Sequence, residues 1–234
     1  DLVLLHFQGL ACASEVMLNG CVLGKSRGFL EPVEFDVRGH LRKGKNRLEV
    51  KIPAVAPVAA QAPRIAPGCA EVVPGFVVAG LTRGIWREAA VLFFKTVRVI
   101  DVAVKQDHAA VGGVGLTVAV RSERYEPDKH LEVLARVCYK GNIMHEARAI
   151  LDRDSLDLAI TVKNPQFWWP AGMGEQPLYE VTVDVLAGRT CLEHVSRRIG
   201  LRDFRIETKK TGNDLLLRFL INGQPFFLKG ASWC

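Results

Sequence analysis

Alternation of apolar and polar residues with a period of two is the feature that most constrains the fold of this chain. Over residues 33–37, valine and phenylalanine alternate with glutamate and aspartate. Successive side chains of a β-strand lie on opposite faces of the sheet, so this pattern predicts a strand with one buried and one solvated face. The same alternation recurs over residues 47–52, 116–120, 131–137, 156–162 and 179–185. Because no long segment keeps a helical period, we expect an all-β protein.

The distribution of these short strands predicts two β-sandwiches. We expect the first over residues 1–97 and the second over residues 98–199, where a new set of alternating strands begins and ends. Residues 53–80 hold five prolines and are expected to form a long loop within the first sandwich, because proline cannot donate to a strand ladder. The tail over residues 200–234 is too short to fold alone.

Composition and charge exclude several classes of protein. Hydrophobic residues make up 49% of the chain and charged residues 24%, which is typical of a globular protein with a buried core. The net charge is +6, but the basic residues are spread singly, and the densest cluster, over residues 42–47, is expected in a solvated turn. We therefore expect no nucleic-acid partner. No apolar run reaches the roughly 18 residues that a membrane span requires, so we expect no membrane partner.

The spacing of cysteine and histidine predicts neither a metal site nor a cofactor. No cysteine belongs to a CxxC motif or stands at zinc spacing from a histidine, and the six histidines share no spacing. We expect free thiols in preference to a disulfide framework. The cysteines are Cys12, Cys21, Cys69, Cys138, Cys191 and Cys234. A Ser-His-Asp arrangement and a phosphate-binding glycine loop are also missing from the sequence.

The last sixteen residues, FLINGQPFFLKGASWC, predict a hairpin. Asn222-Gly223 stands between apolar β-formers, and these two residue types favour the positive φ angles of a tight two-residue turn. We expect the return strand over Pro225–Leu228, running on into Gly230–Trp233.

Further stretches occur in the order of one known family. In the first sandwich they are Glu15–Gly20 with Gly24, Glu34–Val37, Gly44–Leu48 and Gly84–Arg87. In the rest of the chain they are Phe167–Pro170, Gly174, Pro177–Tyr179, Gly200–Arg202 and Ile221–Trp233. Any one stretch is weakly specific. Together, in this order, they resemble glycoside hydrolase family 2, the family of β-galactosidases, β-glucuronidases and β-mannosidases.

The resemblance implies the architecture of each part. Residues 1–97 are expected to form a jelly-roll-type, sugar-binding-like sandwich with a truncated start, and residues 98–199 an immunoglobulin-like β-sandwich. Residues 200–234 would be the first hairpin and strand of a catalytic (β/α)₈ barrel. Such a barrel needs roughly 250 residues, so the chain would hold only its entrance.

The resemblance also implies a function for the complete protein. The sequence of Lys229–Trp233 is most similar to that of β-mannosidases, and this resemblance implies a retaining exo-β-glycosidase with a carbohydrate substrate. Residues 72–82 hold neither the tryptophan nor the carboxylate that many β-mannosidases carry there, so a β-galactosidase, β-glucuronidase or exo-β-glucosaminidase stays open. A non-catalytic carbohydrate-binding or adhesion protein of two sandwiches is the other alternative. Oligomeric state and compartment are not indicated.

No catalytic residue is expected in this chain. The two carboxyl groups of a retaining glycosidase come from later barrel strands in this family, and Glu175, in a glycine-rich connection, is expected to be merely exposed. Trp233 and Ser232 are the candidate substrate-binding residues. They would lie at the C-terminal end of the first barrel strand, near the rim of the active site. Packing inside the barrel is the alternative for both.

Other tryptophans and one arginine are given structural roles. Adjacent residues of a strand face opposite ways, so at most one of Trp168 and Trp169 could stack on a sugar, and packing is favoured for both. Trp86 is expected to pack in the sandwich or between domains. By the resemblance, Arg202 would pair with a carboxylate of the barrel.

Overall fold

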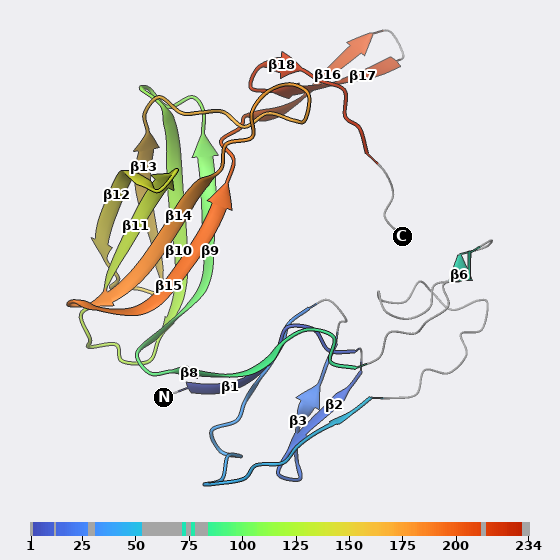
Figure 1. The fold of residues 1–234 in the computed structure, drawn as a ribbon, viewed down its shortest axis with the longest axis vertical. Coiled ribbons are helices and arrows are strands. Elements are labelled where there is room, and N and C mark those ends of the chain that lie inside the picture. The colour runs from blue at the N-terminus through green and yellow to red at the C-terminus, as the bar shows by residue number, and fades with distance from the viewer. Residues whose placement is uncertain are drawn as a thin grey trace. The chain divides into compact units, whose positions relative to one another are not determined.

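The computed structural model describes residues 2–11, 13–27, 31–52, 72–73, 76–77, 84–211 and 214–230 (Figure 1). Within these ranges the chain forms eighteen β-strands and no helix, which confirms the all-β prediction. None of the described residues forms a helix long and apolar enough to cross a membrane. The chain divides into two compact units, Asp1–Lys95 and Thr96–Cys234, and each is described separately below.

The first unit contains two three-stranded antiparallel sheets. One has the order β4 (Val33–Asp36), β1 (Leu2–Phe7) and β8 (Ala89–Phe94). The other has the order β3 (Cys21–Lys25), β2 (Glu15–Leu18) and β5 (Leu48–Lys51). Their buried core cluster consists of Leu5, Phe7, Leu10, Val16, Leu18 and Val37. A short pair, β6 (Val72–Val73) and β7 (Phe76–Val77), falls within the expected proline-rich loop, most of which lies outside the described residues.

Two asparagines fix the predicted solvated turn at residues 42–47, all of which are exposed. Asn46 Oδ1 accepts hydrogen bonds from Arg42 N (2.8 Å) and from Asn19 Nδ2 (2.8 Å). Asn19 Oδ1 in turn accepts from Arg47 N at 2.9 Å. The basic cluster therefore lies on an exposed turn, as predicted, and side-chain hydrogen bonds of the two asparagines hold its backbone.

Trp86 packs within the first unit, as expected. Its backbone N donates to Gly9 O at 3.1 Å, and a Cβ atom built on Gly9 would lie only 2.6 Å from Trp86 Cε2. The Arg87 guanidinium lies 4.2 Å from the centre of the indole ring. Glycine at position 9 is thus what allows the indole to approach the backbone.

The second unit is a sandwich of a three-stranded and a four-stranded antiparallel sheet (Figure 1). The first sheet has the order β13 (Ser155–Val162), β10 (Val114–Arg124) and β9 (Val97–Asp107). The second has the order β12 (Asn142–Ile150), β11 (Glu132–Tyr139), β14 (Tyr179–Ala187) and β15 (Thr190–Ile199). The inward residues of the predicted alternation form one core, including Val118, Val133, Ile160 and Val183. The alternation therefore predicted the correct inward face of these strands.

Tyr179 is the largest fully buried side chain of this unit. Its ring stacks on that of Tyr139 with 4.7 Å between centroids. Its hydroxyl oxygen accepts a hydrogen bond from Gln166 N at 2.8 Å. The tyrosine thus joins the core to the long connection between β13 and β14, and the partnered hydroxyl explains how a polar atom is accommodated there.

A three-stranded meander follows the sandwich: β16 (Phe204–Thr211), β17 (Asp214–Ile221) and β18 (Gln224–Pro225). Asn222 and Gly223 have φ angles of 49° and 78°, so the predicted two-residue hairpin turn is confirmed. The predicted return strand over Pro225–Leu228 is wrong in extent, because paired residues end at Pro225. One further bond, from Phe226 N to Phe219 O (3.0 Å), continues the ladder, and Phe227 to Gly230 belong to no strand. Proline donates no hydrogen bond, which weakens the pairing from its first residues.

The outer face of the four-stranded sheet carries a line of charged side chains across all four strands. Arg136 Nη1 donates to Asp184 Oδ2 at 2.7 Å, and His194 Nδ1 lies 2.6 Å from Asp184 Oδ1. Arg136 Nε also lies 3.6 Å from Glu146 Oε2. Asp184 is only 9% exposed, because its two partners cover it. Burial, followed by the negative charge of Asp184, raises the pKa of the nearby Cys191 thiol.

Removal of the Asp184 charge should make Cys191 more reactive. Asp184→Asn eliminates a charge that disfavours the thiolate, so the pKa of Cys191 falls and more thiolate is present at a given mildly alkaline pH. We expect the alkylation rate of Cys191 by iodoacetamide to rise about threefold, since burial still opposes ionisation. Mass spectrometry of the Cys191 peptide measures this rate, with exposed Cys21 as the internal reference. An unchanged alkylation rate in a folded Asp184→Asn protein would contradict the effect of the Asp184 charge on the pKa of Cys191.

Candidate functional site

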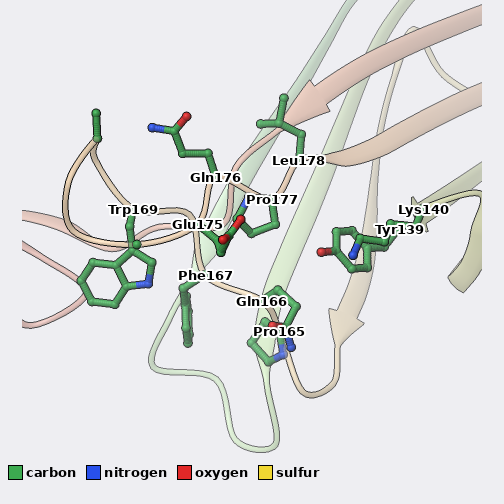
Figure 2. Close-up of a pocket in the computed structure, with 12 residues that line it drawn as sticks. Tyr139, Lys140, Pro165, Gln166, Phe167, Trp169, Glu175, Gln176, Pro177 and Leu178 are labelled. Carbon is green, nitrogen blue, oxygen red and sulfur yellow. The ribbon is translucent and has the colours of Figure 1, made fainter.

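A groove of about 1030 Å³ lies on the second unit, beside the connection between β13 and β14 (Figure 2). Two segments far apart in the sequence form it: the end of β11 with its following turn, and residues 165–178. The lining residues are Tyr139, Lys140, Pro165, Gln166, Phe167, Trp169, Ala171, Gly174, Glu175, Gln176, Pro177 and Leu178. The groove therefore combines aromatic rings with two amides, one cationic side chain and one anionic side chain.

The turn between β11 and β12 places Lys140 at the rim of the groove. Lys140 and Gly141 have φ angles of 50° and 80°, the left-handed pair of a two-residue hairpin turn. The Lys140 ammonium nitrogen lies 5.3 Å from the centre of the Tyr139 ring. Tyr139 is in turn stacked on buried Tyr179, so this wall of the groove is continuous with the sandwich core.

The opposite wall is a loop that folds back on itself at Trp169. Trp169 N donates to Glu175 O at 2.9 Å, and Met173 N donates to Pro170 O at 3.0 Å. A Cβ atom built on Gly174 would lie 2.9 Å from Trp169 Cδ1, so only glycine fits against the pyrrole edge of the indole. The loop therefore holds the Trp169 ring in one place at the edge of the groove (Figure 2).

Trp168 faces different surroundings. Its N donates to Leu201 O at 2.8 Å, and a Cβ atom on Gly200 would lie 2.8 Å from Trp168 Cγ. The Arg202 guanidinium lies 4.6 Å from the centre of the Trp168 ring. The assumption that the two tryptophans belong to a strand is wrong, because residues 163–178 form none. The expectation that at most one of them could meet a ligand nevertheless agrees with these contacts: Trp169 lines the groove and Trp168 packs on Gly200.

Residues 200–203 are held to the sandwich by side-chain amides. Gln106 Nε2 donates to Gly200 O and Gln106 Oε1 accepts from Arg202 N, both at 3.1 Å. Asn222 Nδ2 donates to Trp168 O at 3.1 Å, while Asn222 Oδ1 accepts from Asp203 N at 2.9 Å. The turn residue of the hairpin is thus also its attachment to the sandwich.

The expected ion pair of Arg202 with a barrel carboxylate is not tested by the described residues and stays a prediction. Trp233 and Ser232, the predicted substrate-binding residues, lie outside the described residues, and their role also stays a prediction. Glu175 is exposed and lines the groove. Within the described ranges, no three histidine, cysteine or acidic side chains gather as they would around a metal ion. The groove itself was not predicted from the sequence.

Two family models match this chain, one over most of each unit. The family model for the "Glycosyl hydrolase 2 galactose-binding domain-like" domain matches residues 1–86, and that for "Glycosyl hydrolases family 2" matches residues 97–202. Together these matches cover most of the chain, in the order predicted from the motifs. The chain belongs to glycosyl hydrolase family 2.

Two relatives and one solved structure illustrate this similarity. The chain is 27% identical to "Beta-mannosidase B" of Aspergillus clavatus over 157 residues, which are 65% of this chain and 18% of that protein. It is 23% identical to "Exo-beta-D-glucosaminidase" of Streptomyces avermitilis over 245 aligned residues, covering 98% of this chain and 26% of that protein. The crystal structure of a beta-D-mannosidase from Dictyoglomus thermophilum has the same fold, with a TM-score of 0.82 at 24% identity. That alignment covers 100% of this chain and 31% of the crystallised one, so the chain spans less than a third of each of these proteins.

Proposed function

We propose that this chain is the non-catalytic N-terminal part of a retaining exo-β-glycosidase that hydrolyses terminal β-linked sugars, with β-mannosidase-like specificity. The observation that carries the proposal is the succession of two family-2 matches, over residues 1–86 and 97–202. The similarity to beta-mannosidase B supports the choice of sugar. In this proposal residues 200–234 are the entrance to the (β/α)₈ barrel.

An exo-β-glucosaminidase is the second candidate. The relative of that name in Streptomyces avermitilis aligns with 98% of this chain, whereas beta-mannosidase B aligns with 65%. Identity is higher to the mannosidase, 27% against 23%, so coverage and identity favour different sugars. A comparison of the two substrates in one assay decides between them.

The acids of the second unit support a non-catalytic role for this chain. A retaining glycosidase uses two carboxyl groups about 5–5.5 Å apart, one as nucleophile and one as acid and base. Several of the acids described in this unit are paired with basic side chains. Examples are Asp184 with Arg136 (2.7 Å), Glu132 with Arg148 (3.0 Å) and Asp203 with Arg205 (2.7 Å). In the proposal, these sandwiches orient the barrel that carries the two carboxyl groups.

We expect the pure 234-residue chain to hydrolyse no aryl β-glycoside above the buffer background. The complete coding sequence, expressed in parallel, should be active and should show its highest kcat/KM on p-nitrophenyl β-mannoside. The panel also includes the β-glucosaminide, β-galactoside and β-glucuronide.

Each result of this panel has a distinct meaning. A higher kcat/KM of the complete protein on the glucosaminide than on the mannoside would identify an exo-β-glucosaminidase instead of a β-mannosidase. Turnover by the 234-residue chain would contradict its non-catalytic role. Inactivity of the complete, folded protein on every substrate would favour a carbohydrate-binding or adhesion protein.

A further inference from the structure

The groove beside residues 165–178 has the chemistry of a saccharide-binding site. We propose that it binds a β-linked oligosaccharide, with one sugar ring stacked on Trp169 and the neighbouring hydroxyls hydrogen-bonded by Lys140, Gln166 and Glu175. The choice of a β-linked saccharide rests on the proposed function. The groove itself is inferred from its own geometry.

The aromatic side of the groove offers flat apolar surface to a ligand. Phe167 is 37% exposed and contacts His108 with 6.0 Å between ring centroids. Trp169 is half-buried, with one edge of its ring against Gly174. In Figure 2 both rings extend from the same strand-free connection. An aromatic ring that is partly buried and partly exposed has surface left for a ligand, and the C–H face of a pyranose is a flat apolar surface of matching shape.

Four polar side chains of the groove make no hydrogen bond or ion pair in the part of the chain that the structure describes: Lys140, Gln166, Glu175 and Gln176. Lys140 contacts only the face of the Tyr139 ring, at 5.3 Å from its centre, whereas several other acids of this unit are paired. Two amides, one cation and one anion supply both donors and acceptors with no net charge. Sugar hydroxyls require both, whereas a polyanion or a polycation would require one sign. A neutral saccharide therefore fits this set of groups.

The groove is formed before any ligand arrives. Tyr139 and Tyr179 connect one wall to the core, and Gly174 fixes the other. Fixed walls reduce the ordering that binding would otherwise require. Its volume of about 1030 Å³ lies at the upper end of the range for ligand sites, which suits several sugar rings better than a single one.

Isothermal titration of the 234-residue chain tests the proposal. The probes are β-linked mannotetraose and β-linked N-acetylglucosamine tetraose, both of which are neutral, with α-linked maltotetraose as the comparison. We expect a β-linked tetraose to bind, and Trp169→Ala to weaken that binding by about tenfold or more. Phe93→Ala removes a ring that is 72% exposed in the other unit, and it should leave the affinity unchanged.

Further variants separate ligand contact from folding. Trp169→Phe keeps an aromatic face and should retain most of the affinity, whereas Glu175→Gln and Lys140→Ala should each weaken it about threefold to tenfold. Circular dichroism verifies that each variant is folded. The proposal is overturned if no β-linked tetraose binds at millimolar concentration, or if folded Trp169→Ala binds as tightly as the unmodified chain. Hydrolysis of p-nitrophenyl glycosides by the complete protein is measured independently, so the groove and the proposed activity can fail separately.

Discussion

Tyr179→Ala is expected to lower the free energy of unfolding of the Thr96–Cys234 unit by about 3–5 kcal/mol. The ring is 1% exposed and is stacked on Tyr139, so its removal leaves a cavity between the core and the groove wall. The hydrogen bond that Gln166 N donates to the hydroxyl is lost as well. Urea denaturation followed by circular dichroism measures the change.

The matched variant Tyr179→Phe separates the ring from the hydroxyl. It keeps the stacked ring and removes only the acceptor of Gln166 N, so we expect a loss of about 1–2 kcal/mol. If Tyr179→Ala costs no more than Tyr179→Phe, the ring is not part of the packed core. The same pair, tested by titration with the tetraoses, would report how far the shape of the groove depends on this residue.

Trp233→Ala in the complete protein should lower kcat/KM on the preferred aryl glycoside by about 100-fold or more. This expectation follows from the proposal that Trp233 and Ser232 shape the sugar pocket at the end of the first barrel strand. Loss of a ring that positions the sugar raises the barrier while most of the fold remains. A tryptophan in the barrel core would instead cost about 3–5 kcal/mol of stability on truncation.

Kinetics and melting temperature, measured on the same preparation, distinguish the two roles of Trp233. A large fall in melting temperature with near-normal turnover of the folded fraction would assign the residue to barrel packing. Ser232→Ala is the smaller companion change. It should affect KM or kcat without a large change in melting temperature, because its side chain is small.

Strands with one buried and one solvent-exposed face were predictable from the sequence. Strands without that contrast were not. The stretch 179–185 alternates cleanly, and its inward residues are buried in β14. Asn142–Ile150 also forms a strand, β12, but at the edge of its sheet, where Ile143 is 58% exposed. All residues over 142–146 are exposed, so this part of β12 has no buried face and the sequence there shows no alternation that would predict the strand.

The groove depends on contacts that are distant in sequence. The sequence predicted that at most one of the two tryptophans in Phe167–Pro170 could contact a ligand. The fold is needed to show that Trp169 lines the groove while Trp168 packs on Gly200. Lys140 comes from a hairpin turn on another strand. Gly174, which directly follows the turn closed by Met173 N and Pro170 O, is a local signal of close packing, but a glycine does not show which ring it contacts.

Asn222 has a consequence for how such proteins can exchange parts. Because this one side chain bonds both Trp168 O and Asp203 N, the hairpin turn is tied directly to the immunoglobulin-like sandwich. A chimaera joined between Ile199 and Phe204 would take its sandwich and its hairpin from different proteins. The bond between Asn222 and Trp168 O would then depend on a match between the two parents. A junction after Gly223 would transfer the sandwich together with the Asn222 bonds, so the segment joined there would follow a hairpin turn that is still held by its own sandwich.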